Sequence, residues 1–348
     1  MTAPATAESE AHTVPKFIIR RLLQLVAVAF VLSVLLFAWL RALPGGVVSA
    51  MLGERATPDS RAALEAAFGL NEPLYVQYWK FLSRALEGDF GVSTAVLPGK
   101  QVTAILLSRA PATIELSIVA LTLAIALAIP LGYLAAKKRA SFLDNASIIG
   151  SLVGVAVPVF FLAFLLKYVF AIKLGWLPVS GRQGVPDATH VTGFFVLDGL
   201  ITREWDAAWD AFKHLILPAL ALSSIPFAMI FRITRASVLE VLDEDFVRTA
   251  RAKGLSRRVV RGRHVMRNAL LPVVTAVGLQ TGALLSGAVL TETVFNFPGM
   301  GEALKVAFEK RDYPVLQLLI LVAAMVYVLV NLVVDILYAV IDPRVRTR

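Results

Sequence analysis

The stretch LLQLVAVAFVLSVLLFAWL, residues 22–40, contains no charged residue and follows the basic residues Lys16, Arg20 and Arg21. About 20 apolar residues suffice for a helix to cross the hydrocarbon core of a bilayer, and this run is longer than the core of a typical signal peptide. No A-x-A cleavage site follows it. We therefore predict an uncleaved membrane-spanning helix here, with a secretory signal peptide as the alternative.

The composition of the whole chain indicates the same class of protein. Hydrophobic residues make up 57% of the 348 positions, which is well above their share in ordinary globular domains. The formal net charge is +9, but the basic residues cluster at the ends of apolar runs, where they mark membrane topology rather than nucleic-acid binding. Because the chain has no cysteine, disulfides, thiolate metal sites and thiol catalysis are excluded.

Six apolar runs are long enough to cross a bilayer at a helical rise of about 1.5 Å per residue. We therefore predict an all-α polytopic membrane protein with six transmembrane helices. Pro158 lies inside the third run and predicts a kink there. The expected spans are residues 22–43, 111–136, 145–172, 214–231, 270–290 and 314–341.

Four groups of basic residues flank these runs, at residues 16–21, 137–139, 232–267 and 344–348. With six spans all four groups fall on one side of the membrane, and the positive-inside rule makes that side the cytoplasm. Both termini are therefore expected in the cytoplasm. Residues 1–15 are small and polar and are predicted to form a disordered cytoplasmic tail. Residues 16–348 are predicted to form one transmembrane domain.

The first external segment, residues 41–110, is too long for a simple connection. Three stretches there, AALEAAFGL, EPLYVQYWKFLSRALEG and VTAILLSRA, predict short amphipathic helices separated by Gly and Pro breaks. Such helices could shield the bundle, or they could contact a partner or a substrate. The sequence leaves both interpretations open.

No pattern of catalytic residues is present, so we predict a non-enzymatic protein. The phosphate-binding pattern G-x-x-x-x-G-K-[ST] is absent, as are H-E-x-x-H and G-x-S-x-G. The four histidines show no zinc-site spacing, and no metal is expected. Two ionisable residues inside the spans, Glu115 and Lys167, are expected to extend toward the membrane interface, with a role in a transport pathway as the alternative.

Residues 245–272, DFVRTARAKGLSRRVVRGRHVMRNALLP, form a long basic segment between two apolar runs. The stretch 245–253 has helix-compatible composition and an acidic start, which a helix dipole favours. Gly254 suits a left-handed helix cap, and Ser256 can cap a second helix. The pattern predicts a helix–Gly–helix element on the positively charged side of the membrane.

This basic segment has two interpretations. Its charge could simply fix topology or contact anionic membrane lipid. However, the run is longer than topology requires, and Phe246, Val247 and Ala250 would form a small apolar patch that fits a groove on another protein. Docking is the interpretation that we favour.

The same segment resembles the cytoplasmic coupling motif of bacterial ABC-importer permeases, specifically the dipeptide, oligopeptide and nickel family. In the general motif Glu-Ala-Ala is followed three residues later by Gly and then by Leu-Pro. Here residues 248–250, Arg-Thr-Ala, occupy the first places, Gly254 the glycine and residues 271–272 the closing pair. Arg248 departs from the usual glutamate and the gap after Gly254 is longer than in sugar permeases, but VRTARAKGL with a long gap is similar to the peptide and nickel branch.

Other stretches extend this resemblance over nearly the whole chain. They are RRLLQLV, FGLNEPLYVQYWKFL, GDFGVS, TETVFNFPGMG, RDYP and NLVVDILYAVIDPRVR. The N-terminal pattern and the long first external segment are similar to the first (B-type) of the two paired permeases. The resemblance implies the fold of an ABC type I importer permease in the bacterial plasma (inner) membrane, with residues 232–267 as the cytoplasmic coupling segment.

The resemblance also implies a function and partners. The chain would be the permease subunit of an ATP-driven importer of dipeptides or oligopeptides, and nickel chelates stay an alternative cargo. A second permease subunit would pair with it as a heterodimer, one or two cytoplasmic ABC ATPases would hold ATP and Mg, and an extracytoplasmic binding protein would deliver cargo. This chain would hold no cofactor and bind no nucleic acid. The residues expected to couple it to an ATPase are Asp245, Phe246, Arg248, Thr249, Ala250, Gly254 and Leu255.

The motif TETVFNFPGMG allows two interpretations. A Pro-Gly turn could simply link the fifth span to a short external helix. Alternatively, the motif closes an external gate or contacts the binding protein, because loops on a rigid scaffold often carry function. The candidate residues are Phe295, Phe297, Pro298, Gly299 and Met300.

Two functions of other classes compete with an ATP-driven permease. A secondary transporter would need no ATPase, but the spans lack the chain of acidic residues that proton-driven carriers tend to have. A membrane scaffold or receptor could use residues 245–272 to recruit a different cytoplasmic partner.

Overall fold

The computed structural model describes residues 13–42, 57–59, 62 and 71–341. Within these ranges the regular elements are helices, and extended pairing is limited to one bridge between Val92 and Gln101. The predicted all-α class is therefore confirmed. Three helices are long and apolar enough to cross a membrane, and the number rises to five if each of two bent helix pairs is one span. The count of six stays a prediction.

The helix boundaries correct several expected ones. The first helix, α2 (Thr13–Ala42), includes residues 13–15, which were assigned to the tail. The stretch EPLYVQYWKFLSRALEG contains α5 (Leu74–Leu86), as predicted, whereas AALEAAFGL lies outside the described residues apart from Ala62.

The stretch VTAILLSRA was wrongly predicted as a separate external helix. It is the first part of α6 (Val102–Lys137), which continues through Pro111 without a break. Proline is tolerated inside a spanning helix because neighbouring groups can satisfy the carbonyl that it frees. The proline at position 111 therefore led to a predicted helix end that the structure does not have.

The third predicted span is broken rather than kinked. It consists of α7 (Phe142–Ala156), α8 (Val159–Leu166) and the π-helical turn η2 (Lys167–Lys173), and its two parts are bent by 106°. Val157 between them has extended φ/ψ values of −80° and 122°. Proline disfavours the helical conformation of the preceding residue and lacks the N–H that would continue the ladder, which explains why the break falls at Pro158.

The described chain divides into two compact units, which we describe separately. The first comprises residues 1–113 and 298–328 and contains α2, α5, the start of α6, α14 (Met300–Glu309) and the start of α15 (Tyr313–Ile341). Its apolar core joins α6, α14 and α15. Its buried members include Ile105, Val102, Met300, Tyr313, Leu316 and Leu319.

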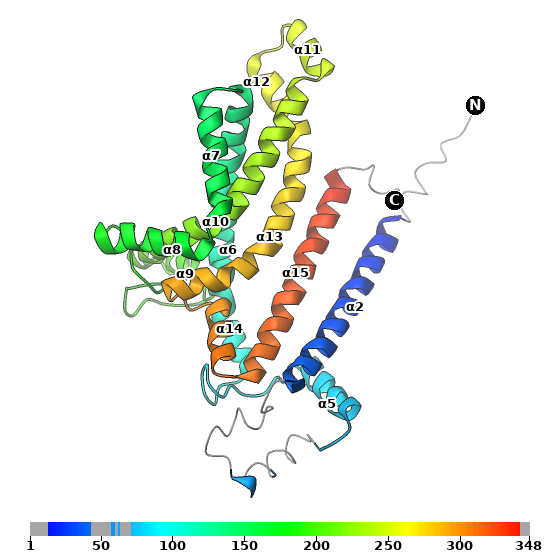
Figure 1. The fold of residues 1–348 in the computed structure, drawn as a ribbon, viewed down its shortest axis with the longest axis vertical. Helices are drawn as coiled ribbons and strands as arrows, with labels where there is room; N and C mark the ends of the chain where they lie inside the picture. Colours follow the sequence, from blue (N-terminus) through cyan, green and yellow to red (C-terminus); the bar gives the residue numbers. More distant parts are fainter. Residues whose placement is uncertain (1–12, 43–56, 60–61, 63–70, 342–348) are drawn as a thin grey trace, which may run out of the picture. The chain divides into compact units, whose positions relative to one another are not determined.

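The second unit, residues 114–297 and 329–348, is built around α10 (Trp205–Leu242). This helix packs against α7, α8, α9 (Phe195–Ile201) and α13 (Arg267–Phe295), and it lies beside α13 in Figure 1. In its most apolar window 67% of residues are buried, compared with 28% in α6, so α10 is the central helix. Small residues allow close approach: a Cβ added at Gly132 of α6 would lie 2.9 Å from Thr234 Cβ.

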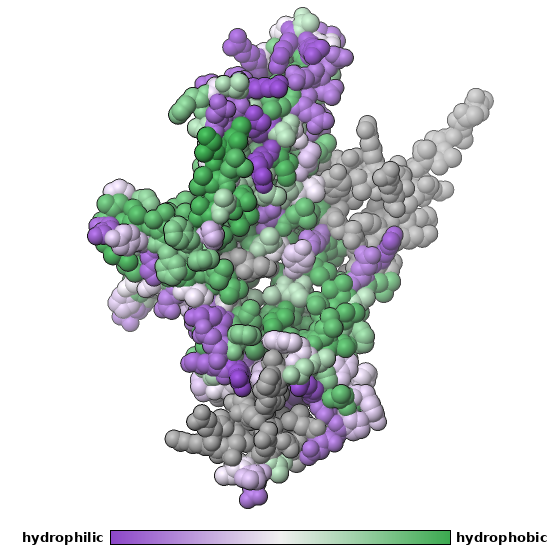
Figure 2. All heavy atoms as spheres, viewed as in Figure 1, coloured by the Kyte–Doolittle hydropathy of each residue, from purple (hydrophilic) through white to green (hydrophobic). Residues whose placement is uncertain are grey.

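At one end of the second unit, α10 leads into α11 (Asp245–Ala252), α12 (Arg257–Val259) and the π-helical segment η3 (Val260–Met266), which continues into α13. Figure 2 shows hydrophilic side chains gathered over α11 and α12, whereas hydrophobic ones cover α7 and α8. The apolar helices of this unit therefore carry a polar tip.

Candidate functional site

The predicted docking segment contains a helix that ends in a glycine cap. Gly254 follows α11 with φ +75°, in the left-handed region. Its N–H donates to Arg251 O at 3.0 Å, and Leu255 N–H donates to Ala250 O at 3.3 Å. This pair of bonds is a Schellman motif, which satisfies carbonyls that the helix end would leave free. The predicted left-handed cap at Gly254 is confirmed.

The second helix of this segment begins at the predicted cap. Ser256 Oγ accepts a hydrogen bond from Val259 N–H at 3.4 Å. The helix is not an isolated short element, since α12, η3 and α13 follow one another without an intervening loop. A displacement of the tip can therefore pass directly along the backbone into α13.

The apolar patch proposed for docking differs from the sequence prediction. Val247 and Ala250 are buried, at 0% and 4% exposure, in a cluster with Val238 of α10. Ala250 is therefore not a surface contact, because the protein's own core covers it. Phe246 and Leu255 are about 40% exposed and remain available to a partner.

The polar residues of α11 leave most of their donors accessible. Arg248 Nη1 lies 3.4 Å from Asp245 Oδ1, but both side chains are largely exposed and such a pair contributes little stability. Thr249 Oγ1 donates to the carbonyl of Asp245 at 2.9 Å. The surface of α11 and its cap thus presents Phe246, Arg248 and Leu255 without strong internal ties.

An ion pair fixes α10 to the first turn of α7. Arg235 Nε and Nη2 contact the two carboxylate oxygens of Asp144 at 2.6 and 2.8 Å, and Ala140 N–H donates to the same carboxylate at 3.0 Å. This bidentate geometry is the strong form of an arginine–carboxylate pair. Sequence reasoning missed it, although Ser141 and Asp144 have the S-x-x-D spacing of a helix start, and Ser141 does cap α7.

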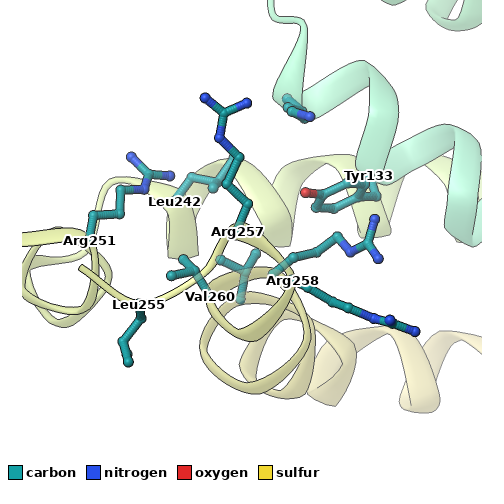
Figure 3. A pocket seen from close by; sticks show the side chains of 10 residues that line it. Tyr133, Leu242, Arg251, Leu255, Arg257, Arg258 and Val260 are labelled. Atoms are coloured by element: carbon teal, nitrogen blue, oxygen red, sulfur yellow. The ribbon is translucent and has the colours of Figure 1, made fainter. Parts of the chain in front are cut away.

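A pocket of about 740 Å³ opens between α11, α12 and the neighbouring ends of α6 and α10. In Figure 3, Tyr133 of α6, Leu242 of α10 and several arginines surround the opening. Its floor includes the buried side chains of Val260 and Val265. The residues lining it are Tyr133, Lys137, Leu242, Arg251, Leu255, Arg257, Arg258, Val260, Arg261 and Val265.

At its other end, α13 is held by Lys167 of η2 and by Gly181 of the loop between η2 and α9. Lys167 Nζ donates to Val294 O at 2.7 Å, and Gly181 N–H donates to Phe295 O at 3.0 Å. Both bonds satisfy carbonyls at the C-terminus of α13. The ammonium group of Lys167 therefore binds the backbone of α13, and its expected extension toward the membrane interface stays a prediction.

The candidate gate residues are divided by the connection between α13 and α14. Phe295 and Phe297 are 1% and 0% exposed, so their rings offer no surface to a binding protein, and that part of the prediction is corrected. Pro298 and Gly299 complete the link, as the simple structural interpretation predicted. Met300 begins α14, and its N–H donates to Thr113 Oγ1 of α6 at 2.8 Å.

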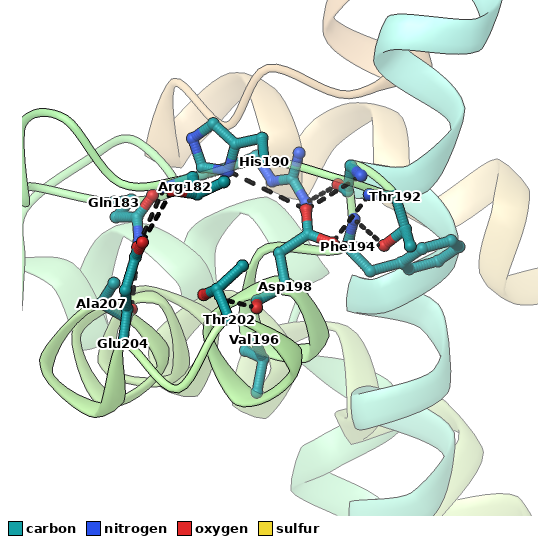
Figure 4. Close-up of polar contacts among 12 residues, drawn as sticks. Arg182, Gln183, His190, Thr192, Phe194, Val196, Asp198, Thr202, Glu204 and Ala207 are labelled. Carbon is teal, nitrogen blue, oxygen red and sulfur yellow. Dashed lines mark hydrogen bonds and ion pairs between the residues drawn. The ribbon is translucent and has the colours of Figure 1, made fainter.

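A buried polar network organises the loop between η2 and α9 (Figure 4). Arg182 Nη2 donates to Glu115 Oε2 at 2.7 Å and to Gly193 O at 2.9 Å, and its guanidinium lies 3.7 Å from the Phe195 ring centre. The other oxygen of Glu115 accepts from Val196 N–H at 2.9 Å. Burial lowers the pKa of Arg182, while Glu115 acts in the opposite direction. Glu115 is therefore internally paired, which corrects the expectation that it reaches the interface.

Asp198 forms the second centre of this network. It is fully buried and accepts hydrogen bonds from Thr192 Oγ1 at 2.6 Å, Thr192 N–H at 2.8 Å and Gly193 N–H at 3.0 Å. Burial alone would raise the pKa of Asp198, but these bonds hold it below its ordinary value. His190 stacks on Phe195, with ring centres 3.9 Å apart. Sequence reasoning missed this network because its members carry no recognisable motif.

Across the described parts of the chain, no three His, Asp or Glu side chains come together as a metal site would require. The second unit thus has two polar regions, an exposed basic segment at α11 and α12 and a buried network around Arg182 and Asp198.

Known proteins resemble the chain over nearly its full length. A family model described as "Binding-protein-dependent transport system inner membrane component" matches residues 128–347, and a model of the N-terminal part of such components matches residues 14–117. The di/tripeptide transport system permease protein DppB of Pseudomonas aeruginosa is 46% identical over 332 residues, which cover 95% of this chain and 98% of that protein. The dipeptide transport system permease protein DppB of Alkalihalophilus pseudofirmus is 44% identical, covering 95% and 99%. The glutathione transport system permease protein GsiC of Escherichia coli is 38% identical, covering 95% and 98%.

Proposed function

Because this chain belongs to the family of binding-protein-dependent transport system inner membrane components, we propose that it is the permease subunit through which an ATP-driven importer takes up dipeptides or oligopeptides. It is a multi-pass protein of the inner membrane. The observation that carries the cargo assignment is the end-to-end similarity to relatives named for dipeptide, di/tripeptide and glutathione transport, all of which are short peptides.

The chain works with partners. A second permease subunit forms a heterodimer with it and completes the pathway, and an extracytoplasmic binding protein delivers the peptide. One or two cytoplasmic ABC ATPases hold ATP and Mg, and this chain holds no cofactor. The absence of a phosphate-binding loop from this sequence supports that division, since the energy must then come from another chain.

Coupling runs through α11 and Gly254. The exposed side chains of Phe246, Arg248 and Leu255 enter a groove on the ATPase, whereas Val247 and Ala250 anchor α11 to the core of this unit. Because α11 is anchored in this way, movement of the ATPase groove is transmitted to α10 and α13 rather than absorbed by the tip. ATP shifts the equilibrium only if the ATPase pair binds it more tightly in the closed state. This assignment places both termini and residues 232–267 in the cytoplasm.

The buried end of α13 forms part of the outer gate. Its carbonyls are held by Lys167 and Gly181, and the rings of Phe295 and Phe297 are packed in the described conformation. Opening requires these rings to leave their packed positions, together with the link at Pro298, Gly299 and Met300. The broken helix α7–α8, which carries Lys167 beyond its bend, is the element that can move them.

The decisive experiment is uptake of a labelled dipeptide by vesicles that contain this chain, its permease partner and the ATPases. Uptake is expected to require ATP on the ATPase side and the binding protein on the other. A labelled free amino acid is the matched control and should not accumulate. Accumulation driven by a proton gradient without ATP would instead establish a secondary transporter.

A further inference from the structure

Five cationic side chains surround the pocket beside the docking helix. Lys137 ends α6, Arg251 lies on α11, and Arg257, Arg258 and Arg261 belong to α12 and η3. All five residues are exposed. Four elements, α6, α11, α12 and η3, therefore bring positive charge to the rim of a single cavity.

These charges are not neutralised by the surrounding protein. In the part of the chain that the structure describes, no ion pair or side-chain hydrogen bond joins any of the five to another residue. Nearby cations such as Arg235 and Arg248 do have carboxylate partners. Like charges that converge without partners repel one another, and this repulsion is relieved when an anion binds between them.

The place and lining of the pocket indicate what kind of anion fits. Lys137 and Tyr133 lie at the end of α6, one turn after a long apolar stretch, so the pocket opens where a spanning helix leaves the membrane. The apolar side chains of Leu242, Leu255 and Val260 line the same cavity as the cations. A ligand that combines a charged head with apolar chains matches both features.

We propose that this pocket binds the phosphate head group of an anionic phospholipid from the adjacent leaflet. The guanidinium groups form bidentate hydrogen bonds to phosphate oxygens, for which their planar donors are suited. Clusters of basic residues next to spanning helices commonly recognise anionic lipids in this way. The volume of about 740 Å³ lies in the range of about 300–1,000 Å³ found for organic-ligand pockets, and so exceeds what one inorganic phosphate needs.

Of the three side chains proposed to enter the ATPase groove, Leu255 alone also lines the pocket. Phe246 and Arg248 do not line the pocket, whereas Arg251 and Leu255 do. A bound head group would therefore fill the space behind α11 and tie it to the end of α6. Because the site is a property of this chain alone, it can be tested without the transport activity proposed above.

The test compares two paired substitutions of equal charge. The pocket variant is Arg258→Gln with Arg261→Gln, and the control is Arg263→Gln with Arg267→Gln, which lie in the same basic segment but do not line the cavity. The purified full chain is titrated with phosphatidylglycerol or phosphatidylcholine, and bound lipid is counted by native mass spectrometry. The wild type and the control should retain phosphatidylglycerol, and the pocket variant should bind it on the order of tenfold more weakly. Phosphatidylcholine should not discriminate among the three.

Three further results would overturn the proposal. One is equal retention of phosphatidylglycerol by the pocket and control variants. A second is displacement of the lipid by millimolar inorganic phosphate or ATP, which would identify a soluble phosphate site. The third is loss of bound lipid whenever the ATPase partner is added, which would show that a protein surface fills the pocket. Lys137→Gln, a single change at the end of α6, gives the same comparison if the paired variant does not fold.

Discussion

Ser93 Oγ donates a hydrogen bond to Asp312 Oδ2 at 2.5 Å, although 219 residues separate them in the chain. The same oxygen accepts from the N–H groups of Thr94, Ala95 and Val96 at 3.1, 2.9 and 3.0 Å. Successive backbone N–H groups of this kind form a nest for an anion, and here a side chain of the protein itself occupies it. Residues 93–96 are thereby fastened to the residue that precedes α15.

Replacing Asp312 should loosen this fastening. Asp312 is fully buried, so Asp312→Ala leaves several buried donors without an acceptor, and we expect a loss of about 3 kcal/mol of unfolding free energy. Thermal unfolding of the purified chain in detergent measures the change. Asp89→Asn is the control, because Asp89 accepts a similar bond from Gly91 N–H but is exposed, and its effect should stay within about 0.5 kcal/mol.

The stability of the protein against unfolding should also depend on pH through Asp312. Burial would raise its pKa, but the hydrogen bonds from Ser93 and the backbone outweigh burial and lower it. A carboxyl with a lowered folded-state pKa stabilises the fold at pH values above its unfolded pKa of about 4, and this contribution is lost as the pH falls through the folded value. The difference in unfolding midpoint between wild type and Asp312→Asn should therefore be constant from pH 8 to 6 and narrow below pH 4. A difference that is unchanged at pH 3 would contradict this account.

Removing one partner of the buried Arg182–Glu115 ion pair should cost more stability than removing both charges. Arg182→Met leaves the Glu115 carboxylate buried without its cation, at a cost of about 3 kcal/mol or more. Adding Glu115→Gln to Arg182→Met removes the stranded charge and should recover much of that loss. A double-mutant cycle, measured by thermal unfolding, separates the cost of leaving Glu115 unpaired from the cost of losing the packing of Arg182. Equal destabilisation by the single and double variants would show that packing of Arg182 on Phe195, rather than charge, dominates.

Replacing Gly254 should weaken coupling to the ATPase, because other residues disfavour the backbone conformation at this position. A Cβ added there meets nothing within 4 Å, so steric overlap with neighbours is excluded and the cost comes from φ +75°. Gly254→Val should therefore disfavour the turn by about 1–2 kcal/mol, and peptide-stimulated ATP hydrolysis by the complete transporter should fall while membrane insertion persists. Gly254→Asn is the matched control, because asparagine adopts the left-handed region more readily, and it should retain more stimulation. Equal peptide stimulation of ATP hydrolysis in the wild type and both variants would show that α11 and its cap do not take part in coupling.

How much of this structure the sequence predicts depends on how far apart in the sequence the interacting residues lie. The left-handed cap at Gly254 and the cap at Ser256 were predictable because both depend on residues a few positions away. The partners of Glu115 and Asp144 were not, since Arg182 and Arg235 lie 67 and 91 residues away. Local composition cannot specify which distant charge meets a buried one.

The broken third span shows the same limit. Pro158 marks the place of the break through a local effect on the preceding residue. The 106° angle depends on how α7 and α8 pack against α10 and α13, which the local sequence does not encode. Likewise, the outward direction of Phe246 and the inward direction of Ala250 follow from the neighbouring core rather than from the helical pattern alone.

The close packing of α6 on α10 gives a final prediction with an internal control. A Cβ at Gly132 would lie 2.9 Å from Thr234 Cβ and 3.0 Å from Phe231 O, one of them a backbone atom that cannot move independently. Gly132→Ala must therefore push the two helices apart, at an expected cost of about 1–3 kcal/mol. Gly150 of α7 meets nothing within 4 Å, so Gly150→Ala should be neutral or stabilising by up to about 1 kcal/mol, because alanine favours the helix. Thermal unfolding of both variants decides the matter, and if Gly132→Ala is as stable as Gly150→Ala, then α6 does not pack on α10 at this distance.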